Sequence, residues 1–334
     1  MYNVSEFLKN INSRSVPFQG SFRFNEPMSK HTTFKTGGHA ELWIRPDGDC
    51  FPDFSVFLLE SARKEGIPVF ILGGGANLVV SDDGIPGIVL DTTGYSDEAG
   101  NGNLGVGSRE LGVGNNRDFH SLATPHSHSL IFRAGTAVDD AVEIAAAHSL
   151  SGLEFLAGMP GTMGGALWMN ARCYDREMSD VVRQVQLLED EGVVTVVPQK
   201  SDFAYKKSPF QEKNGLILSV AVAVEDKDPE IIRKEMEEHR KDRESKGHYR
   251  YPCGGSVFKN NRAFGKPTGQ ILDELGLRGL TVGDAQLAPW HGNIIINRGK
   301  ASSEDILALT EILEERARAE LGIELERELL FIGN

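Results

Sequence analysis

Apolar and polar residues follow one another in short blocks along the chain, and their spacing predicts a mixed α and β structure. In the first part of the chain, the apolar runs 40–44 and 68–72 predict two strands. Residues 54–64 carry apolar side chains at helical spacing and end before Gly66, which predicts a helix between these strands. Strand, helix and strand in this order form a small α/β unit.

The middle of the chain is richer in strand patterns. Residues 129–135 predict a strand, and a helix with small apolar residues on one face is expected after Thr136. Three further strand patterns follow, separated by polar turns, at 181–188, 193–197 and 216–224.

A strongly charged helix is predicted from Pro229 to about Lys246, with Asp228 as its N-cap. Its polarity suggests a solvent-exposed connector and a change of domain near residue 247. Beyond it, the patterns predict a helix, a strand, a long helix opened by a capping box, and a terminal strand, at 268–275, 293–297, 303–321 and 324–333.

Composition limits the kind of protein. The 334 residues suffice for two or three domains, and 40% apolar with 25% charged residues is typical of globular chains. The formal net charge of −13 disfavours binding to nucleic acid or to an anionic membrane surface. The N-terminal residues lack an apolar signal region, and the most apolar stretch, 215–224, is far shorter than the roughly 20 residues of a membrane span. Three widely spaced cysteines predict no disulfide framework and no metal site, which favours the cytoplasm.

Residues 95–128 differ from their surroundings because they are rich in Gly, Asn, Ser and His. A surface insertion is the simplest interpretation. A regulatory or metal-binding role for His120, His126 and His128 is the alternative.

Glycine is concentrated in clusters, and the 37 glycines exceed the share expected of about 7%. The clusters at 73–75 and 158–165 each offer a loop whose backbone N–H groups can approach an anion closely, because no Cβ intervenes. Neither is a Rossmann fingerprint or a P-loop. Together they could hold one diphosphate from two sides, while each alone could be a tight structural turn.

Six segments carry a resemblance to a known family, the UDP-N-acetylenolpyruvoylglucosamine reductases, which are flavoenzymes of peptidoglycan precursor synthesis. The segments are HTTFKTGGHAELWIRP (31–46), ILGGGANLVVSDDGIPGIVLDTTG (71–94), GLEFLAGMPGTMGGALWMNA (152–171), FAYKKSPFQ (203–211), GGSVFKN (254–260) and LERELLFIG (325–333). The short stretch after Phe210 resembles the shorter family form, which lacks an extra tyrosine-bearing loop.

The resemblance implies an α+β chain with a vanillyl-alcohol-oxidase (PCMH-type) FAD-binding fold and a C-terminal α+β substrate-binding domain. The implied boundaries are 1–81 for the first FAD-binding subdomain, 82–246 plus 322–334 for the second, and 247–321 for the substrate domain. It also implies residues that hold FAD, namely Gly73, Gly74, Gly75, Ala76, Asn77, Leu78, Ser81, Gly158, Pro160, Gly161, Gly164, Gly165 and Asn170.

The implied reaction uses NADPH and FAD to reduce UDP-N-acetylglucosamine enolpyruvate to UDP-N-acetylmuramate. Hydride addition beside a carboxylate requires a proton donor at the α carbon and stabilisation of negative charge. Ser256 matches the family's proton donor and Glu328 its second acid, for which we expect partial burial. The alternatives are a turn-capping hydroxyl and an exposed strand carboxylate.

Lys206 stands where the family usually has arginine, so the charge is kept while the planar guanidinium is lost. Lys207 could take this role instead, or both lysines could be solvated. The resemblance implies further substrate contacts at Tyr205, Lys207, Lys259, Asn260, Gln286, His291 and Asn293. His291 could equally be a packed histidine.

Some positions depart from the family pattern. Arg172 and Cys173 replace small residues, and Leu330 occupies a position that is often basic. These departures leave two alternatives, which are another FAD-linked oxidoreductase on the same scaffold and a non-catalytic protein that binds flavin or a nucleotide sugar. A monomer is expected.

Overall fold

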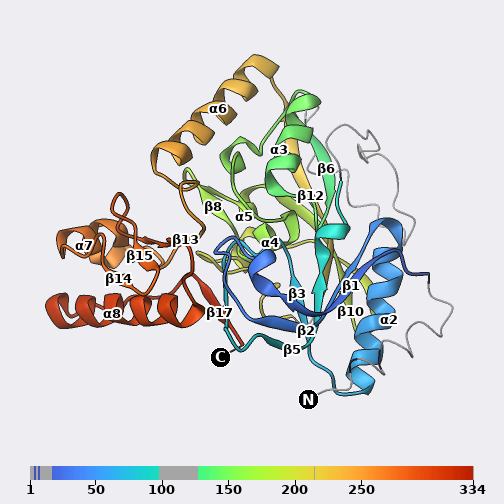
Figure 1. Ribbon diagram of the computed structural model, residues 1–334. Helices are drawn as coiled ribbons and strands as arrows, with labels where there is room; N and C mark the ends of the chain where they lie inside the picture. The colour runs from blue at the N-terminus through green and yellow to red at the C-terminus, as the bar shows by residue number, and fades with distance from the viewer. Residues whose placement is uncertain (1–3, 5–6, 8–16, 98–126, 214, 334) are drawn as a thin grey trace.

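The computed structural model describes residues 4, 7, 17–97, 127–213 and 215–333 and arranges them in three units (Figure 1). Most of the predicted insertion lies outside the described residues, including His120 and His126. His128 is described, and its Nε2 lies 3.1 Å from a carboxylate oxygen of Asp226. In the described part of the chain, no helix is long and apolar enough to cross a membrane.

The first unit is a four-stranded sheet with the order β1, β2, β5, β3. Its strands are β1 (Gly20–Pro27), β2 (His39–Pro46), β5 (Ile85–Asp91) and β3 (Val69–Leu72). β2 and β3 run parallel to β5, and β1 is antiparallel to β2. Helix α2 (Phe51–Lys64) covers one face, because its Phe54 and Leu58 share a buried cluster with Leu42 and Ile44 of β2. The predicted order of strand, helix and strand is confirmed.

The second unit is an antiparallel sheet with the order β11, β10, β12, β6. Its strands are β6 (Ser127–Arg133), β10 (Val182–Glu189), β11 (Gly192–Val196) and β12 (Leu216–Asp226), with the short β7 (Leu150–Ser151) paired to the end of β12. The central strand β12 is buried along most of its length, which explains its continuous apolar sequence. Around this sheet lie α3 (Val138–Ala147), α4 (Met163–Trp168), α5 (Met178–Val181) and the hairpin of β8 (Arg172–Cys173) and β9 (Arg176–Glu177).

Helix α6 (Pro229–Ser245) begins where the sequence predicts, with the Asp228 side chain accepting a hydrogen bond from the backbone N–H of Glu230. Its expected role as a solvent-exposed connector is correct only in part: most of its residues are exposed and the third unit follows it, but one side of the helix packs against the second unit. Ile232 and Met236 are buried in the core of the second unit, and Arg243 is only 7% exposed. Because most residues of α6 are charged, its composition did not indicate that it has a narrow buried face.

The third unit contains a sheet with the order β13, β16, β15, β14 and two helices, and it lies to one side of the other two units (Figure 1). The strands are β13 (Cys253–Ser256), β14 (Thr281–Val282), β15 (Ala285–Leu287) and β16 (Ile294–Asn297), and the helices are α7 (Thr268–Glu274) and α8 (Ser303–Leu321). Helix α8 begins with the predicted capping box of Ser302 and Asp305 and ends at Gly322 in a left-handed conformation.

Two expected boundaries are wrong. Strand β5 lies inside the first sheet, so the first unit does not end at residue 81. The last strand, β17 (Leu330–Ile332), pairs in parallel with β4 (Leu78–Val80), so it returns to the first unit and not to the second. A short apolar strand carries no sequence signal for its pairing partner, and this explains the error.

Candidate functional site

A cavity of about 1540 Å³ lies where the three units meet, and we call it the main cavity. Ile71 of the first unit, Ile217 of the second and Ser256 of the third all line it. A typical small-molecule site has about 300 to 1,000 Å³. The main cavity therefore has room for more than one ligand at a time.

The two glycine clusters meet in one wall of the main cavity. A Cβ added to Gly74 would lie 2.7 Å from the Cα of Gly161, and one added to Gly73 would lie 2.7 Å from Oγ1 of Thr162. Gly75 has φ +60, and a Cβ there would lie 2.0 Å from the carbonyl oxygen of His31. A side chain at Gly73 or Gly74 would separate the two loops, and one at Gly75 would collide with the backbone of His31.

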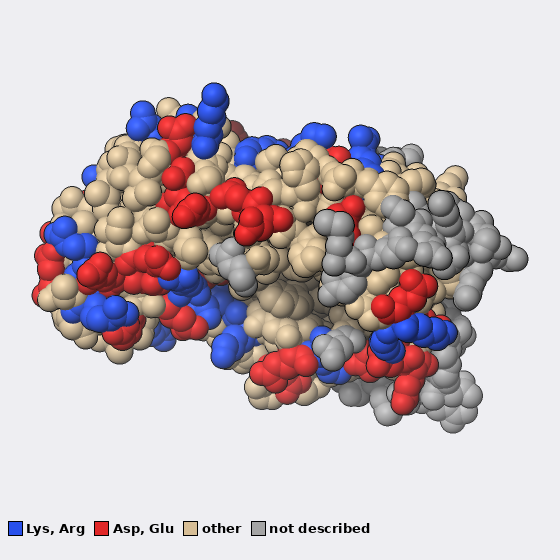
Figure 2. Space-filling model, turned by 60° about the horizontal axis from the view of Figure 1, so that its bottom comes forward, with Lys and Arg blue, Asp and Glu red and all other residues tan. Residues whose placement is uncertain are grey.

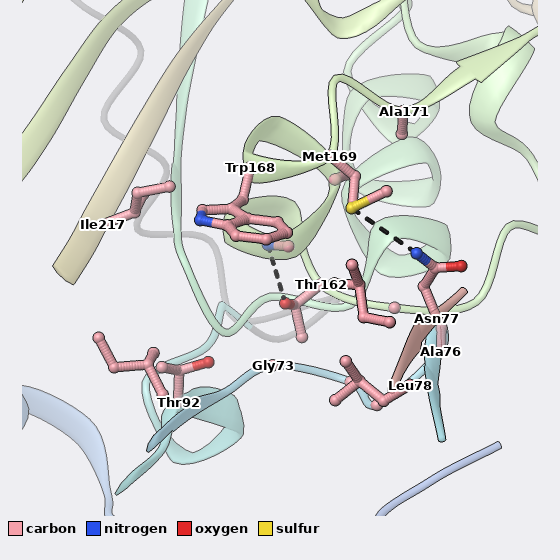
Figure 3. Close-up of a pocket in the computed structure, with 18 of the residues that line it drawn as sticks. Gly73, Ala76, Asn77, Leu78, Thr92, Thr162, Trp168, Met169, Ala171 and Ile217 are labelled. Carbon is pink, nitrogen blue, oxygen red and sulfur yellow. Dashed lines mark hydrogen bonds between the residues drawn. The ribbon is translucent and has the colours of Figure 1, made fainter. Parts of the chain in front are cut away.

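The first loop also presents free hydrogen-bond donors. Among the residues that the structure describes, none accepts a hydrogen bond from the backbone N–H groups of Gly74, Gly75 and Ala76. Buried backbone donors require partners, and a row of them suits the oxygens of a diphosphate. Figure 3 shows Gly73, Ala76 and Leu78 along one side of the pocket, with Trp168 at the end of α4 and Met169 just after that helix on the other.

One end of the main cavity is apolar and suits a buried ring system. The apolar side chains there are Val56, Leu59, Ile67, Val69, Ile71, Leu188 and Ile217, and the ion pair of Arg63 and Asp190 lines the cavity beside them. An apolar end next to a row of free N–H groups matches the two chemical parts of a dinucleotide. The residues present therefore fit FAD.

Most of the predicted FAD-binding residues line this cavity, namely Gly73, Gly74, Gly75, Ala76, Asn77, Leu78, Pro160, Gly161, Gly164 and Gly165. Ser81, Gly158 and Asn170 do not line it. Ser81 accepts a hydrogen bond from the backbone of Asp83, and the N–H of Gly158 donates to Asp139.

Asn170 supports the cavity wall from behind. Its side chain is fully buried, and it donates to the carbonyl of Ala204 and accepts from the N–H of Ser179, both at 3.0 Å. Both side-chain groups of this amide already have protein partners. Its position thus favours a role in shaping the loop before Tyr205 over contact with a ligand.

Lys206 and Glu328 form an ion pair in the main cavity. Nζ of Lys206 lies 2.5 Å from Oε1 of Glu328, and the two side chains are 14% and 11% exposed. The expected partial burial of Glu328 is confirmed. Lys207 is exposed and does not line the cavity, so Lys206 is the lysine that faces the site.

Ser256 lies next to this pair. It is the last residue of β13, and the carbonyl of the following residue, Val257, accepts a hydrogen bond of 2.8 Å from the N–H of Glu328. Asn77 of the first glycine loop holds the same segment, since its Nδ2 donates to the carbonyl of Glu328 at 2.9 Å. Asn77, Lys206 and Ser256, which come from the three units, are thereby held close to Glu328.

Sequence reasoning missed a group of basic residues at the end of α6. Arg243 lines the main cavity; one guanidinium N–H donates to Sγ of Cys173 at 2.6 Å, and Nε has no partner in the described part of the chain. Burial raises the pKa of Cys173 despite the nearby Arg243. Burial, with the charge of Arg243, also lowers the pKa of His248 to about 4. The sequence offered one signal, because Arg243 and Lys246 are spaced about one helical turn apart at the end of a predicted helix.

The predicted substrate residues divide into two groups. Asn260 and His291 line the main cavity. Tyr205 stands beside it, with its hydroxyl accepting a hydrogen bond of 3.4 Å from the N–H of Asn260.

The side chains of Lys259, Gln286 and Asn293 have partners within the protein, and these residues do not line the main cavity. Lys259 is paired with Glu326 at 2.6 Å, and the Gln286 amide donates to the carbonyl of Gly279. Asn293 is only 3% exposed and is engaged by the protein backbone. The positions of these three side chains do not favour direct contact with a ligand in the main cavity.

Comparison with known proteins places the chain in a family. A model for the C-terminal domain of UDP-N-acetylenolpyruvoylglucosamine reductase matches residues 247–332, and an FAD binding domain model matches residues 116–197. The UDP-N-acetylenolpyruvoylglucosamine reductase of Borreliella burgdorferi is 35% identical over 332 residues, covering 99% of this chain and 98% of the relative. The chain belongs to the UDP-N-acetylenolpyruvoylglucosamine reductase family.

Other members of the reductase family agree in sequence and in structure. The reductase of Treponema pallidum is 35% identical, with 93% of each chain covered. A crystal structure of the reductase from Thermus caldophilus matches with a TM-score of 0.70 at 28% identity, over 94% of this chain and 99% of that one. The expected α+β fold with an FAD-binding part is confirmed.

Proposed function

We propose that this reductase uses NADPH and FAD to reduce UDP-N-acetylglucosamine enolpyruvate to UDP-N-acetylmuramate, a step of peptidoglycan precursor synthesis. The observation that carries the proposal is the meeting of Ser256, Glu328 and Lys206 in one cavity with the two glycine loops. Membership of the reductase family favours this activity over another flavin-linked oxidation and over simple ligand binding.

When bound, FAD supplies the hydride chemistry that no amino-acid side chain provides. The free N–H groups of Gly74, Gly75 and Ala76 would hold its diphosphate, and the apolar end of the main cavity would exclude water from a ring system. The enolpyruvyl substrate and NADPH carry further anionic groups. Lys206, Arg243 and Lys246 provide the cations for them inside a chain of net charge −13.

The protein's own contribution is proton transfer and charge stabilisation. Ser256 donates its Oγ proton to the α carbon of the substrate, beside the carboxylate. Lys206 offers its positive charge to the negative charge that develops there, and Glu328 holds the lysine in place through the ion pair. Ser256 is kept in position by β13 and by the contact of Val257 with Glu328.

Replacing Ser256 with alanine tests the proposal. In stopped-flow experiments, we expect Ser256→Ala to be reduced by NADPH at nearly the wild-type rate. Reoxidation by UDP-N-acetylglucosamine enolpyruvate should slow by about 10²- to 10⁴-fold, as expected for the loss of a general acid. Equal damage to both half-reactions would contradict the assignment of Ser256 as proton donor.

We further propose that the enzyme works as a monomer in the cytoplasm. Cys50, Cys173 and Cys253 are free thiols, which suits a reducing compartment. On the face shown in Figure 2, acidic and basic side chains are interspersed. The mixture of charges supports a small-molecule activity over binding to a polyanion.

A further inference from the structure

A second, smaller cavity of about 340 Å³ opens beside the main cavity, and we call it the side pocket. Ser256, Asn260 and His291 line both cavities, so these three residues form the neck between them. The rest of the side pocket is largely polar and includes Asp273 and Arg278, whose side chains pair at 2.6 Å. A polar pocket of this size can hold several water molecules.

Hydrogen bonds with Asn293 fix the backbone of the two residues that follow Ser256. Its Nδ2 donates to the carbonyl of Phe258 at 2.8 Å, and its Oδ1 accepts from the N–H of Phe258 at 3.0 Å. The carbonyl of Asn293 also accepts from the N–H of Val257 at 3.0 Å. Three hydrogen bonds therefore fix Ser256 relative to the segment that contains His291.

The same residue orients the imidazole of His291. The N–H of Asn293 donates to Nδ1 of His291 at 3.1 Å, so the neutral ring carries its proton on Nε2. Burial lowers the pKa of His291, and the positive charges of Arg278 and Lys246 act in the same direction. The ring of His248 also faces it, with centroids 6.0 Å apart. These surroundings keep His291 neutral, with an N–H group to donate.

We propose that His291 is a positioning residue for Ser256, donating a hydrogen bond from Nε2 to the serine oxygen as that oxygen loses its proton. This inference rests on the proposed function. The O–H bond of Ser256 breaks as the C–H bond forms at the substrate α carbon, and the negative charge on Oγ is held by the N–H of His291. Water in the side pocket then returns a proton to Oγ, and the hydroxide formed leaves to solvent. A neutral N–H donor in the same neck as Ser256 stabilises the developing charge and so makes a weakly acidic hydroxyl a better proton donor.

The experiment compares His291→Ala with His291→Gln in both half-reactions of the FAD-loaded protein. Glutamine keeps an N–H donor, and alanine removes it. For His291→Ala we expect unchanged reduction by NADPH and reoxidation slowed by about 10²-fold, the effect of losing one donor to a developing anion. His291→Gln should retain most of the rate, and added imidazole should restore part of the rate of His291→Ala. His148→Gln, at an exposed position that lines neither cavity, is the control.

The outcomes separate the two proposals. If reduced wild-type protein is not reoxidised by the enolpyruvyl substrate, the proposed function fails. If the wild type is reoxidised and His291→Ala matches it, the role of His291 is wrong. Equal loss in the alanine and glutamine variants without rescue by imidazole also overturns it, and equal melting temperatures of the variants exclude a folding defect as the cause of a slow rate.

Discussion

At the scale of single residues, Lys206 and Glu328 form an ion pair that faces the substrate side of the main cavity. Because both side chains are almost nine-tenths buried, removing one leaves the other charged group poorly solvated. Lys207, next in the chain, is exposed and provides a matched control. Substitutions of Lys206 and Lys207 can therefore be compared to test whether the positive charge in the ion pair contributes to the site.

We expect Lys206→Ala to lower the free energy of unfolding by about 1 to 3 kcal/mol, in line with the loss of a partner for a buried charge. The same change should slow reoxidation by the enolpyruvyl substrate more than reduction by NADPH. Lys207→Ala should behave like the wild type in both respects. Urea unfolding and stopped-flow absorbance measure these effects.

Lys206→Arg separates charge from shape. If the positive charge is what matters, arginine should preserve most of the reoxidation rate. A larger effect of Lys207→Ala than of Lys206→Ala would transfer the role to Lys207.

At the scale of elements, the two glycine loops form a single wall because the second loop fills the space that side chains at Gly73 and Gly74 would occupy. Gly74→Ala would place a Cβ 2.7 Å from the Cα of Gly161 and push the loops apart. We expect the variant to lose most of its bound FAD, measured as flavin absorbance per protein after purification. Gly276→Ala is the control, because Gly276 has φ +69 and open space around it, so alanine there adds only backbone strain of about 1 to 2 kcal/mol. Full FAD content in Gly74→Ala would show that the close contact between the loops is dispensable.

The sequence predicts the start of a helix well when the residues that cap the helix are its close neighbours in the chain. The N-cap Asp228 and the capping box of Ser302 and Asp305 satisfy backbone groups within a few residues, so the sequence alone locates the starts of α6 and α8. The short helix α4 was missed because its glycines read only as a loop. The burial of Arg243 was missed because it depends on what packs around the end of α6.

At the scale of the whole molecule, the third unit is attached to the first through shared apolar packing. Phe34 of the first unit is fully buried in one cluster with Val257 and Leu329, and its carbonyl accepts a hydrogen bond of 2.9 Å from Asn297. The neck of the main cavity therefore depends on this attachment as well as on its own residues.

Phe34→Ala should lower the free energy of unfolding by about 3 to 5 kcal/mol, as is typical when a buried phenylalanine is truncated. We also expect faster proteolysis in residues 247–329, because the third unit loses its anchor. Phe22, which is 42% exposed, offers the control variant Phe22→Ala with little change in stability. Equal proteolysis of the two variants would rule out Phe34 as the anchor.

The motifs identified the family and most of the residues in the main cavity, because those residues lie in short contiguous segments. They could not show that Asn170 and Asn293 are engaged by the backbone, since their partners lie 34 and 35 residues away in the chain. For the same reason the motifs could not place β17 beside β4, since non-local pairing follows from the assembled fold.

The pairing of β17 with β4 has a consequence during translation. Glu328, whose carbonyl accepts a hydrogen bond from Asn77 of the first glycine loop, is synthesised 251 residues after that asparagine. A nascent chain can form the local helices early, but it cannot close the cofactor wall until β17 has left the ribosome and paired with β4. Stable cofactor loading should therefore wait for β17, and a chain truncated before Glu328 should lack a complete site.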